Sequence, residues 1–108
     1  MARMALSPQT HEALRILAAS IRANRLRRGW TEAELAERVG VSRPTIVNLE
    51  AAKAGVAIGT VLEAATLVGV PLFTDDAERR AAYGALKSTE LALLPESARP
   101  RRALDDDF

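Results

Sequence analysis

The 108 residues of this chain suffice for a single domain with one small core, and their 48% apolar and 27% charged residues exclude wholesale disorder. The formal net charge of +1 conceals a polarity, because residues 1–60 hold nine Lys or Arg against five Asp or Glu, whereas residues 61–98 hold three against six. The absence of cysteine and the single histidine, His11, exclude disulfides, thiolate metal sites, zinc centres and the usual hydrolytic triad.

The apolar residues recur with a helical period of 3.6 and never alternate over the length of a strand, which predicts an all-α protein. The first helix is expected to begin after Ser7 as its N-cap, with Pro8 in the first turn, and to end at Gly29. It forms either one long helix or two helices in line. Its inward side is expected to consist of Leu14, Leu17 and Ile21.

Two short helices are predicted next. Thr31 is the expected N-cap of the second helix, and Gly40 is its expected stop. Ser42 is the expected N-cap of the third helix, where Pro44 occupies the first turn without losing a hydrogen bond. This third helix is predicted to run to Ala52. The inward residues of the two helices are Leu35, Ala36, Val39, Ile46 and Leu49.

The stretch Lys53–Gly59 contains two glycines and no helical period, which predicts a loop. A fourth helix is expected from about Thr60 to Val68, where Gly69 closes it. Its inward residues are Val61, Leu62, Ala65 and Val68. A fifth helix is expected to open at Asp75 and Asp76 and to run to Leu86 or a little beyond. After it, residues 95–108 carry opposed charge blocks and little to bury, which predicts a flexible tail.

The second and third predicted helices, separated by a turn that contains Gly40, form a helix-turn-helix. The small side chain of Ala36 lets the two helices approach, and Val41 fills the turn. The inward stripe leaves four residues on the outer side of the second of these helices, namely Arg43, Pro44, Val47 and Asn48. A side of this composition suits the major groove of DNA.

The residue types on this outer side match base edges. Arginine binds guanine and asparagine binds adenine through paired hydrogen bonds, and valine or proline contacts the methyl group of thymine. The hydroxyls of Ser42 and Thr45 lie near a helix N-terminus, where phosphate is favoured. Taken singly, each residue is more simply interpreted as a solvated surface residue or, for Ser42, as a cap. The candidate DNA contacts are Thr31, Ser42, Arg43, Pro44, Thr45, Val47, Asn48 and Lys53.

The segment Ile21–Val70 resembles the lambda-repressor-like helix-turn-helix domain of the XRE family. The features that carry the resemblance are Arg25 with Gly29, TEAELAERVGVS over the second helix and turn, TIVNLE in the third helix and LVGV after the fourth. The resemblance implies an ion pair between Arg25 and Glu50. The simpler interpretation of these two residues is that both are solvated charges.

The sequence departs from the XRE pattern at two places. The family often has glutamine, a typical phosphate or base contact, where this chain has Glu32, and a glutamate there is expected to repel phosphate. The family also often has asparagine or a small residue and then glycine where this chain has Ala51 and Ala52, so the third helix is expected to end later than usual.

The stretches AGVAIGTVLEAATLVGVPLF and LLPESARPRRALDDDF resemble the small XRE proteins that act as HipB-like antitoxins. This resemblance implies a homodimer that represses its own operon and binds a HipA-type serine/threonine kinase toxin. We expect the last segment to bind such a partner through Arg101, Arg102, Asp105, Asp106, Asp107 and Phe108. A solubilising acidic tail is the simpler interpretation.

Two other functions are alternatives to this one. A stand-alone XRE-type regulator would use the same DNA chemistry without a toxin partner. An enzyme or a purely structural helical module is disfavoured, because no nucleophile lies near a base and no glycine-rich phosphate loop exists. We therefore expect no enzymatic activity, no metal and no cofactor. No apolar run approaches the roughly 20 residues that cross a bilayer, so we expect no membrane partner and a cytoplasmic, nucleoid-associated protein.

These elements predict an organisation in four parts. They are an N-terminal helical extension (1–20), the helix-turn-helix domain (21–73), a C-terminal helix that serves dimerisation (74–94) and the flexible charged tail (95–108). One monomer covers only one DNA half-site, so a homodimer on a double-stranded operator is expected. Residues 71–94 carry apolar side chains to spare for its interface, including Leu72, Phe73, Tyr83, Leu86, Leu91, Leu93 and Leu94. Alternatively, these side chains complete the core of the monomer.

Overall fold

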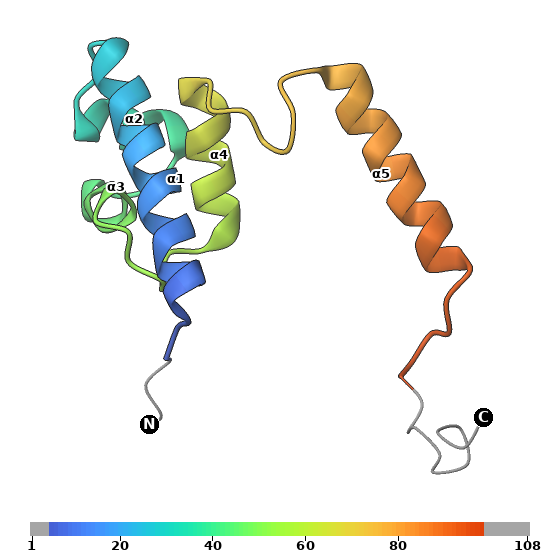
Figure 1. Ribbon diagram of the computed structural model, residues 1–108. Coiled ribbons are helices and arrows are strands. Elements are labelled where there is room, and N and C mark those ends of the chain that lie inside the picture. Colours follow the sequence, from blue (N-terminus) through green and yellow to red (C-terminus); the bar gives the residue numbers. More distant parts are fainter. Residues whose placement is uncertain (1–4, 99–108) are drawn as a thin grey trace. The chain divides into compact units, whose positions relative to one another are not determined.

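The computed structural model describes residues 5–98 of the chain. Its five helices are α1 (Pro8–Arg27), α2 (Glu32–Val39), α3 (Arg43–Glu50), α4 (Ile58–Val68) and α5 (Ala77–Ala92) (Figure 1). The chain divides between Leu72 and Phe73 into two units, so that α1 to α4 belong to the first unit and α5 belongs to the second. The all-α class that the sequence predicts is confirmed.

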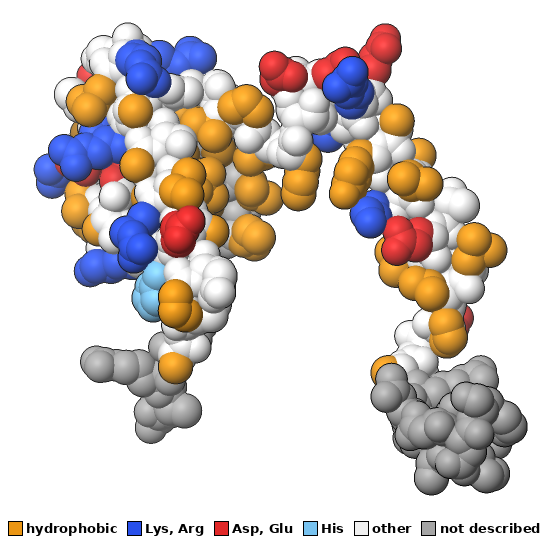
Figure 2. Space-filling model, viewed as in Figure 1, with side chains coloured by type: hydrophobic (Ala, Val, Ile, Leu, Met, Phe, Trp, Pro, Cys, Tyr) orange, Lys and Arg blue, Asp and Glu red, His pale blue; other side chains and the backbone are white. Residues whose placement is uncertain are grey.

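In the described part of the second unit, α5 is the one helix, and it starts from an N-cap at Asp76. The Asp76 carboxylate accepts hydrogen bonds from the backbone N–H groups of Glu78 and Arg79, at 2.9 and 3.3 Å. The helix ends at Ala92 rather than near Leu86. Its last turns were not predicted because the residues directly after Leu86 are polar and show no apolar periodicity. No residue of α5 is buried, and Figure 2 shows apolar side chains exposed along it.

In the first unit, α1 is one continuous helix, which decides between the two alternatives left open by the sequence. Its start is as expected, since Pro8 occupies the first turn and the Ser7 hydroxyl accepts a hydrogen bond from the backbone N–H of Thr10 at 3.4 Å. Residues 8–20 are therefore the first part of the same continuous helix that contains Arg25.

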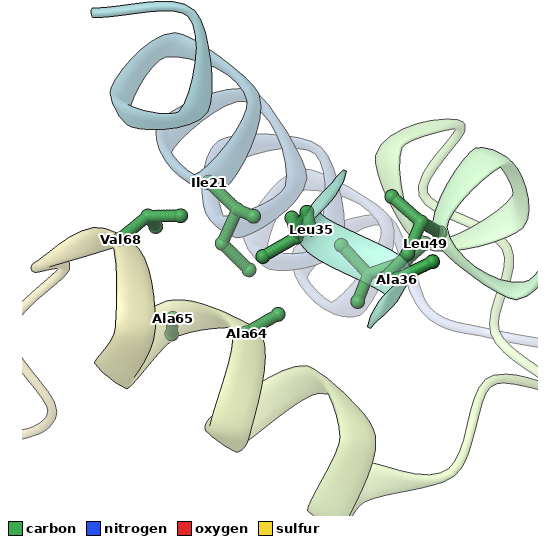
Figure 3. Close-up of a cluster of buried hydrophobic side chains, with 8 residues drawn as sticks. Ile21, Leu35, Ala36, Leu49, Ala64, Ala65 and Val68 are labelled. Carbon is green, nitrogen blue, oxygen red and sulfur yellow. The ribbon is translucent and has the colours of Figure 1, made fainter. Parts of the chain in front are cut away.

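The core of the first unit draws on all four of its helices. Its buried side chains are Ile21, Leu35, Ala36, Ile46, Leu49, Ala64, Ala65 and Val68 (Figure 3). Three of them are alanines, whose small size lets α2 and α4 approach closely. Full burial of Ile46 contributes about 2 kcal/mol to folding and fixes the inner side of α3 against the other helices. The periodicity did not place Ala64 in the core.

Helix α3 ends at Glu50 and not at Ala52, which corrects the prediction of a longer helix. The backbone N–H of Ala52 bonds to the carbonyl of Leu49, and that of Lys53 bonds to the carbonyl of Asn48. This is the Schellman pattern, which requires a left-handed residue at its turn. In α1 and α4 glycine occupies that position, whereas here Ala52 occupies it at φ 59°.

Helix α4 begins at Ile58, two residues before the predicted start, so the loop between α3 and α4 keeps its predicted length and is shifted to residues 51–57. The glycine at position 59 falls in the first turn, where a backbone N–H has no partner within the helix in any case. A glycine there does not break the helix, although it resembles loop sequence. The half-buried Val56 packs against the core and fixes the entry of the chain into α4.

We expect Ala52→Gly to raise the free energy of unfolding by about 0.5 to 1 kcal/mol. The left-handed conformation costs an alanine about 1 to 2 kcal/mol, and the greater freedom of glycine in the unfolded chain offsets part of the gain. Denaturant titration measures the change. Ala51→Gly is the matched control, because Ala51 has φ −83° and gains nothing from glycine. A loss of stability in both variants would contradict the assignment of strain to Ala52.

Candidate functional site

Helices α2 and α3 form a helix-turn-helix whose turn depends on Gly40. This residue adopts φ 87°, ends α2 and is followed by the half-buried Val41, which packs against the core. Both apolar residues of the α3 inner side, Ile46 and Leu49, are buried. The opposite side of α3 is therefore free of the core, and Val47 with a side chain 37% exposed lies at its middle.

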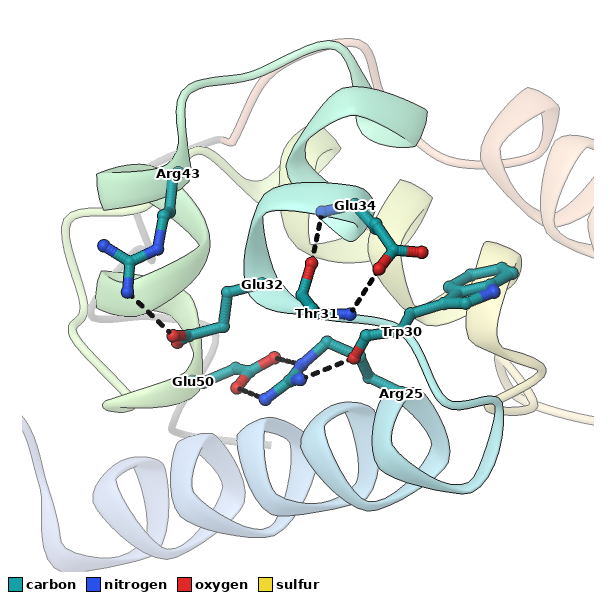
Figure 4. A network of polar contacts seen from close by, with 7 residues as sticks. All are labelled: Arg25, Trp30, Thr31, Glu32, Glu34, Arg43 and Glu50. Atoms are coloured by element: carbon teal, nitrogen blue, oxygen red, sulfur yellow. Dashed lines mark hydrogen bonds and ion pairs between the residues drawn. The ribbon is translucent and has the colours of Figure 1, made fainter.

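Helix α2 is held at its start by a capping box (Figure 4). The Thr31 hydroxyl accepts from the backbone N–H of Glu34 at 3.0 Å, and the Glu34 carboxylate accepts from the backbone N–H of Thr31 at 3.4 Å. Thr31 is exposed, as its predicted contact with the DNA backbone requires, but its hydroxyl already accepts a hydrogen bond in this cap.

The ion pair between Arg25 and Glu50 joins α1 to the last residue of α3. Nε and Nη2 of Arg25 donate to the two carboxylate oxygens of Glu50 at 2.6 and 2.8 Å, and Nη1 donates to the Trp30 carbonyl at 2.8 Å (Figure 4). The two side chains are only 7% and 5% exposed. The hydrogen bonds that Arg25 donates to the Glu50 carboxylate raise the pKa of Arg25; burial opposes this, and the charges of Glu50 and Glu32 add to it.

A second ion pair connects the first turns of α2 and α3. Nη2 of Arg43 lies 3.5 Å from Oε1 of Glu32, and the side chains are 64% and 27% exposed (Figure 4). No sequence pattern indicated this contact, because the two residues lie on different helices. The carboxylate that was expected to repel phosphate thus has a cationic partner on α3.

The structure places the other candidate residues around α3. Pro44 is exposed and Asn48 is half-buried, both away from the core. Ser42 has the extended backbone of an N-cap, but its hydroxyl bonds to the Thr45 hydroxyl at 2.9 Å and makes no bond to the helix backbone. The predicted N-cap position of Ser42 is therefore confirmed, whereas the hydrogen bond between its side chain and the helix backbone is absent.

An open groove lies beside α3. Thr45, Asn48 and Lys53 line it together with the loop residues before α4 and with Thr60, at the start of α4. Lys53 is exposed. No sequence pattern pointed to Thr60, because its proximity to Asn48 depends on how the loop folds back.

The ring of Trp30 lies between two arginines. The guanidinium carbon of Arg38 is 4.0 Å from the ring centroid and that of Arg28 is 5.3 Å from it, so both are within the range of cation–π contacts. Nε of Arg28 also donates to the Val68 carbonyl at 3.2 Å. No sequence motif predicted these contacts.

A family model described as Helix-turn-helix matches residues 21–74, half of the chain. No curated protein and no solved structure gives a significant match. In residues 5–98, no helix is long and apolar enough to cross a membrane, and no cluster of His, Asp and Glu could hold a metal ion.

We expect Arg25→Ala and Glu50→Ala each to lower the free energy of unfolding by roughly 3 kcal/mol, because each change leaves a buried charge without its partner. The double variant should lose much less than the sum of the two single losses. Thermal or denaturant unfolding of the four proteins gives this coupling. Arg22→Ala, which removes an exposed charge from the same helix, should leave the unfolding midpoint unchanged. Additive losses would show that the pair does not act as a unit.

Proposed function

Because the chain belongs to the XRE family of helix-turn-helix proteins, it is a DNA-binding transcriptional regulator, and we propose that it recognises one operator sequence through the outer side of α3. The observation that carries the proposal is the arrangement of this helix. Its inner residues are buried and its last residue is clamped to α1, whereas its outer side faces away from the core and carries side chains of the types that can bind base edges.

The proposed base contacts are Arg43, Pro44, Val47 and Asn48. A major groove about 12 Å wide admits an α-helix, so these side chains meet the base edges directly. Arg43 binds the O6 and N7 atoms of guanine, Asn48 binds the N6 and N7 atoms of adenine, and the two apolar side chains contact thymine methyl groups. Each polar contact thereby reads one base pair.

The proposed phosphate contacts surround the base contacts. Ser42 and Thr45 present hydroxyls at the first turn of α3, where the helix dipole favours an anion, and Lys53 supplies a cation after its last turn. Thr31 lies at the start of α2 and is the proposed contact to the DNA backbone from that helix. These contacts carry no sequence information, and they set the register of α3 in the groove.

Glu32 modulates this surface through Arg43. An isolated carboxylate at the start of α2 would repel the DNA backbone, but the guanidinium of Arg43 lies 3.5 Å away and compensates its charge. Nη2 of Arg43 is directed to Glu32, so the other N–H groups of its guanidinium are available for guanine. Glu32 in this role orients the arginine and does not itself bind phosphate.

A homodimer is the proposed active form. Two recognition helices about 34 Å apart read two half-sites one turn of DNA apart, which a monomer of this size cannot do. The segment 74–94 is the proposed interface, because an isolated helix of this length is marginal in water and α5 exposes Tyr83, Leu86 and Leu91. A second copy of α5 covers these apolar side chains.

The finer proposal is that this regulator is the antitoxin of a HipA-type kinase and represses its own operon. The support is the resemblance of its second half to HipB-like antitoxins. The proposed kinase contacts, Arg101, Arg102, Asp105, Asp106, Asp107 and Phe108, lie outside the described residues. Three consecutive aspartates are repelled by phosphate, so this segment suits a protein partner better than a duplex. The alternative is a stand-alone XRE-type regulator.

Arg43→Ala and Asn48→Ala should each weaken operator binding by about 1 to 3 kcal/mol and relax the preference at one base pair. The operator is first selected from random duplexes by the parent protein, and titrations with single-base variants then measure the preference. At saturation the parent complex should contain two chains for each operator. Glu63→Ala, on the exposed side of α4, is the control and should bind as the parent does. If both α3 variants bound the operator as the parent does, α3 would not be the recognition helix.

Deletion of residues 99–108 should leave operator binding within a few-fold of the parent and weaken capture of the cognate kinase. The reason is that the deleted segment has no net charge to offer the duplex, whereas its charges and Phe108 suit a protein surface. Operator titration and co-purification with the kinase encoded beside the gene measure the two activities. If the truncated protein captured the kinase fully but no longer bound DNA, the assignment of kinase binding to residues 99–108 and of DNA binding to the rest of the chain would be wrong.

A further inference from the structure

The first half of α1 lies beside the segment that follows α3. Leu14 and Ala18 line a small depression together with Ala52 and Lys53. The lysine proposed as a phosphate contact is therefore adjacent to α1, in the turn of that helix that contains Arg15. This stretch of α1 precedes the part that the Helix-turn-helix model matches.

The contacts of α1 determine which of its sides faces α3. Arg25 points towards α3 through its bond to Glu50, and Asn24 points towards α4 through the bond from its Nδ2 to the Val68 carbonyl at 3.1 Å. At 3.6 residues per turn, Arg22 and Arg15 lie about 60° and 80° around the helix axis from Arg25, on the side away from Asn24. Both arginines thus border α3 and not α4.

These two arginines are exposed, and neither has a hydrogen-bond or ion-pair partner among residues 5–98. They lie seven residues apart, about 10 Å along the helix axis, a spacing that lets two guanidinium groups bind separate phosphates of one strand. Figure 2 shows Lys and Arg side chains over α3 and along the neighbouring stretch of α1. By the helical geometry above, Arg15 and Arg22 are the exposed arginines on the side of α1 that borders α3.

We propose that Arg15 and Arg22 form a second DNA contact, which binds the phosphodiester backbone beside the half-site that α3 reads. The inference rests on the proposed operator binding and adds a site on a different helix. A backbone contact of this kind strengthens binding to every sequence by the same factor, because phosphates are identical at each base pair. It therefore adds affinity and salt dependence without changing the preferred operator.

The test compares the parent protein with Arg15→Gln, Arg22→Gln and the double variant, all as full chains. Glutamine preserves the length and helix propensity of the side chain and removes its charge. Arg27→Gln is the matched control, because Arg27 is exposed on another side of the same helix and is directed to Asn24. The probes are the selected operator and a scrambled duplex of equal length, each titrated at several salt concentrations.

We expect each single variant to reduce the slope of log affinity against log salt by about 1, and the double variant by about 2. Affinity for the operator and for the scrambled duplex should fall by the same factor, so their ratio stays at the parent value. The Arg27 variant should keep the parent slope. Shortening the duplex on the flank beyond the half-site should remove the advantage of the parent over the double variant.

Parent-like salt slopes and affinities in the double variant would overturn the inference while the proposed function stands. An Arg27 variant that loses as much salt slope and affinity as the Arg15 or Arg22 variants would also overturn it, because such a loss would indicate a general charge effect. A changed operator preference would also contradict a contact to the backbone alone. Failure of the parent protein to bind any duplex would overturn the proposed function together with this inference.

Discussion

The bidentate ion pair between Arg25 and Glu50 is the constraint on which the position of α3, the proposed recognition helix, depends. The guanidinium uses three nitrogens at once, two for the carboxylate and one for the Trp30 carbonyl, so it fixes the end of α3 against α1 and against the start of the helix-turn-helix. Desolvation of two charges offsets much of the attraction between them, so such a pair adds more to the definition of geometry than to net stability. A lysine at position 25 would lack the planar fork that this arrangement needs.

Local signals in the sequence suffice for most of the fold. Ser7, Thr31, Gly40 and Gly69 mark helix ends because capping and left-handed turns depend on one or two neighbouring residues. The end of α3 escaped prediction because Ala52 adopts a conformation that its own side chain disfavours, and only the packing of the first unit imposes it. The outer side of α3 followed from helical periodicity, since whatever lies opposite a buried stripe is exposed.

The contacts that shape the site are the part that the sequence alone could not supply. Family resemblance, and not spacing, suggested that Arg25 meets Glu50. The approach of Arg43 to Glu32 depends on the crossing of two helices, and no pattern within either helix encodes it. As a result the recognition surface carries less free positive charge than its composition suggests, which makes the remaining cations more important for attraction to a polyanion.

Trp30 is the one tryptophan of the chain, and its surroundings make it an intrinsic optical reporter. Its ring is half-buried between two guanidinium groups, and its carbonyl accepts a hydrogen bond from the clamp that holds α3. The emission of an indole depends on the charges and the solvent around it, so the fluorescence of the native protein monitors the integrity of the first unit at this junction. No label has to be introduced, and the tyrosine of α5 does not interfere when excitation is restricted to the indole band.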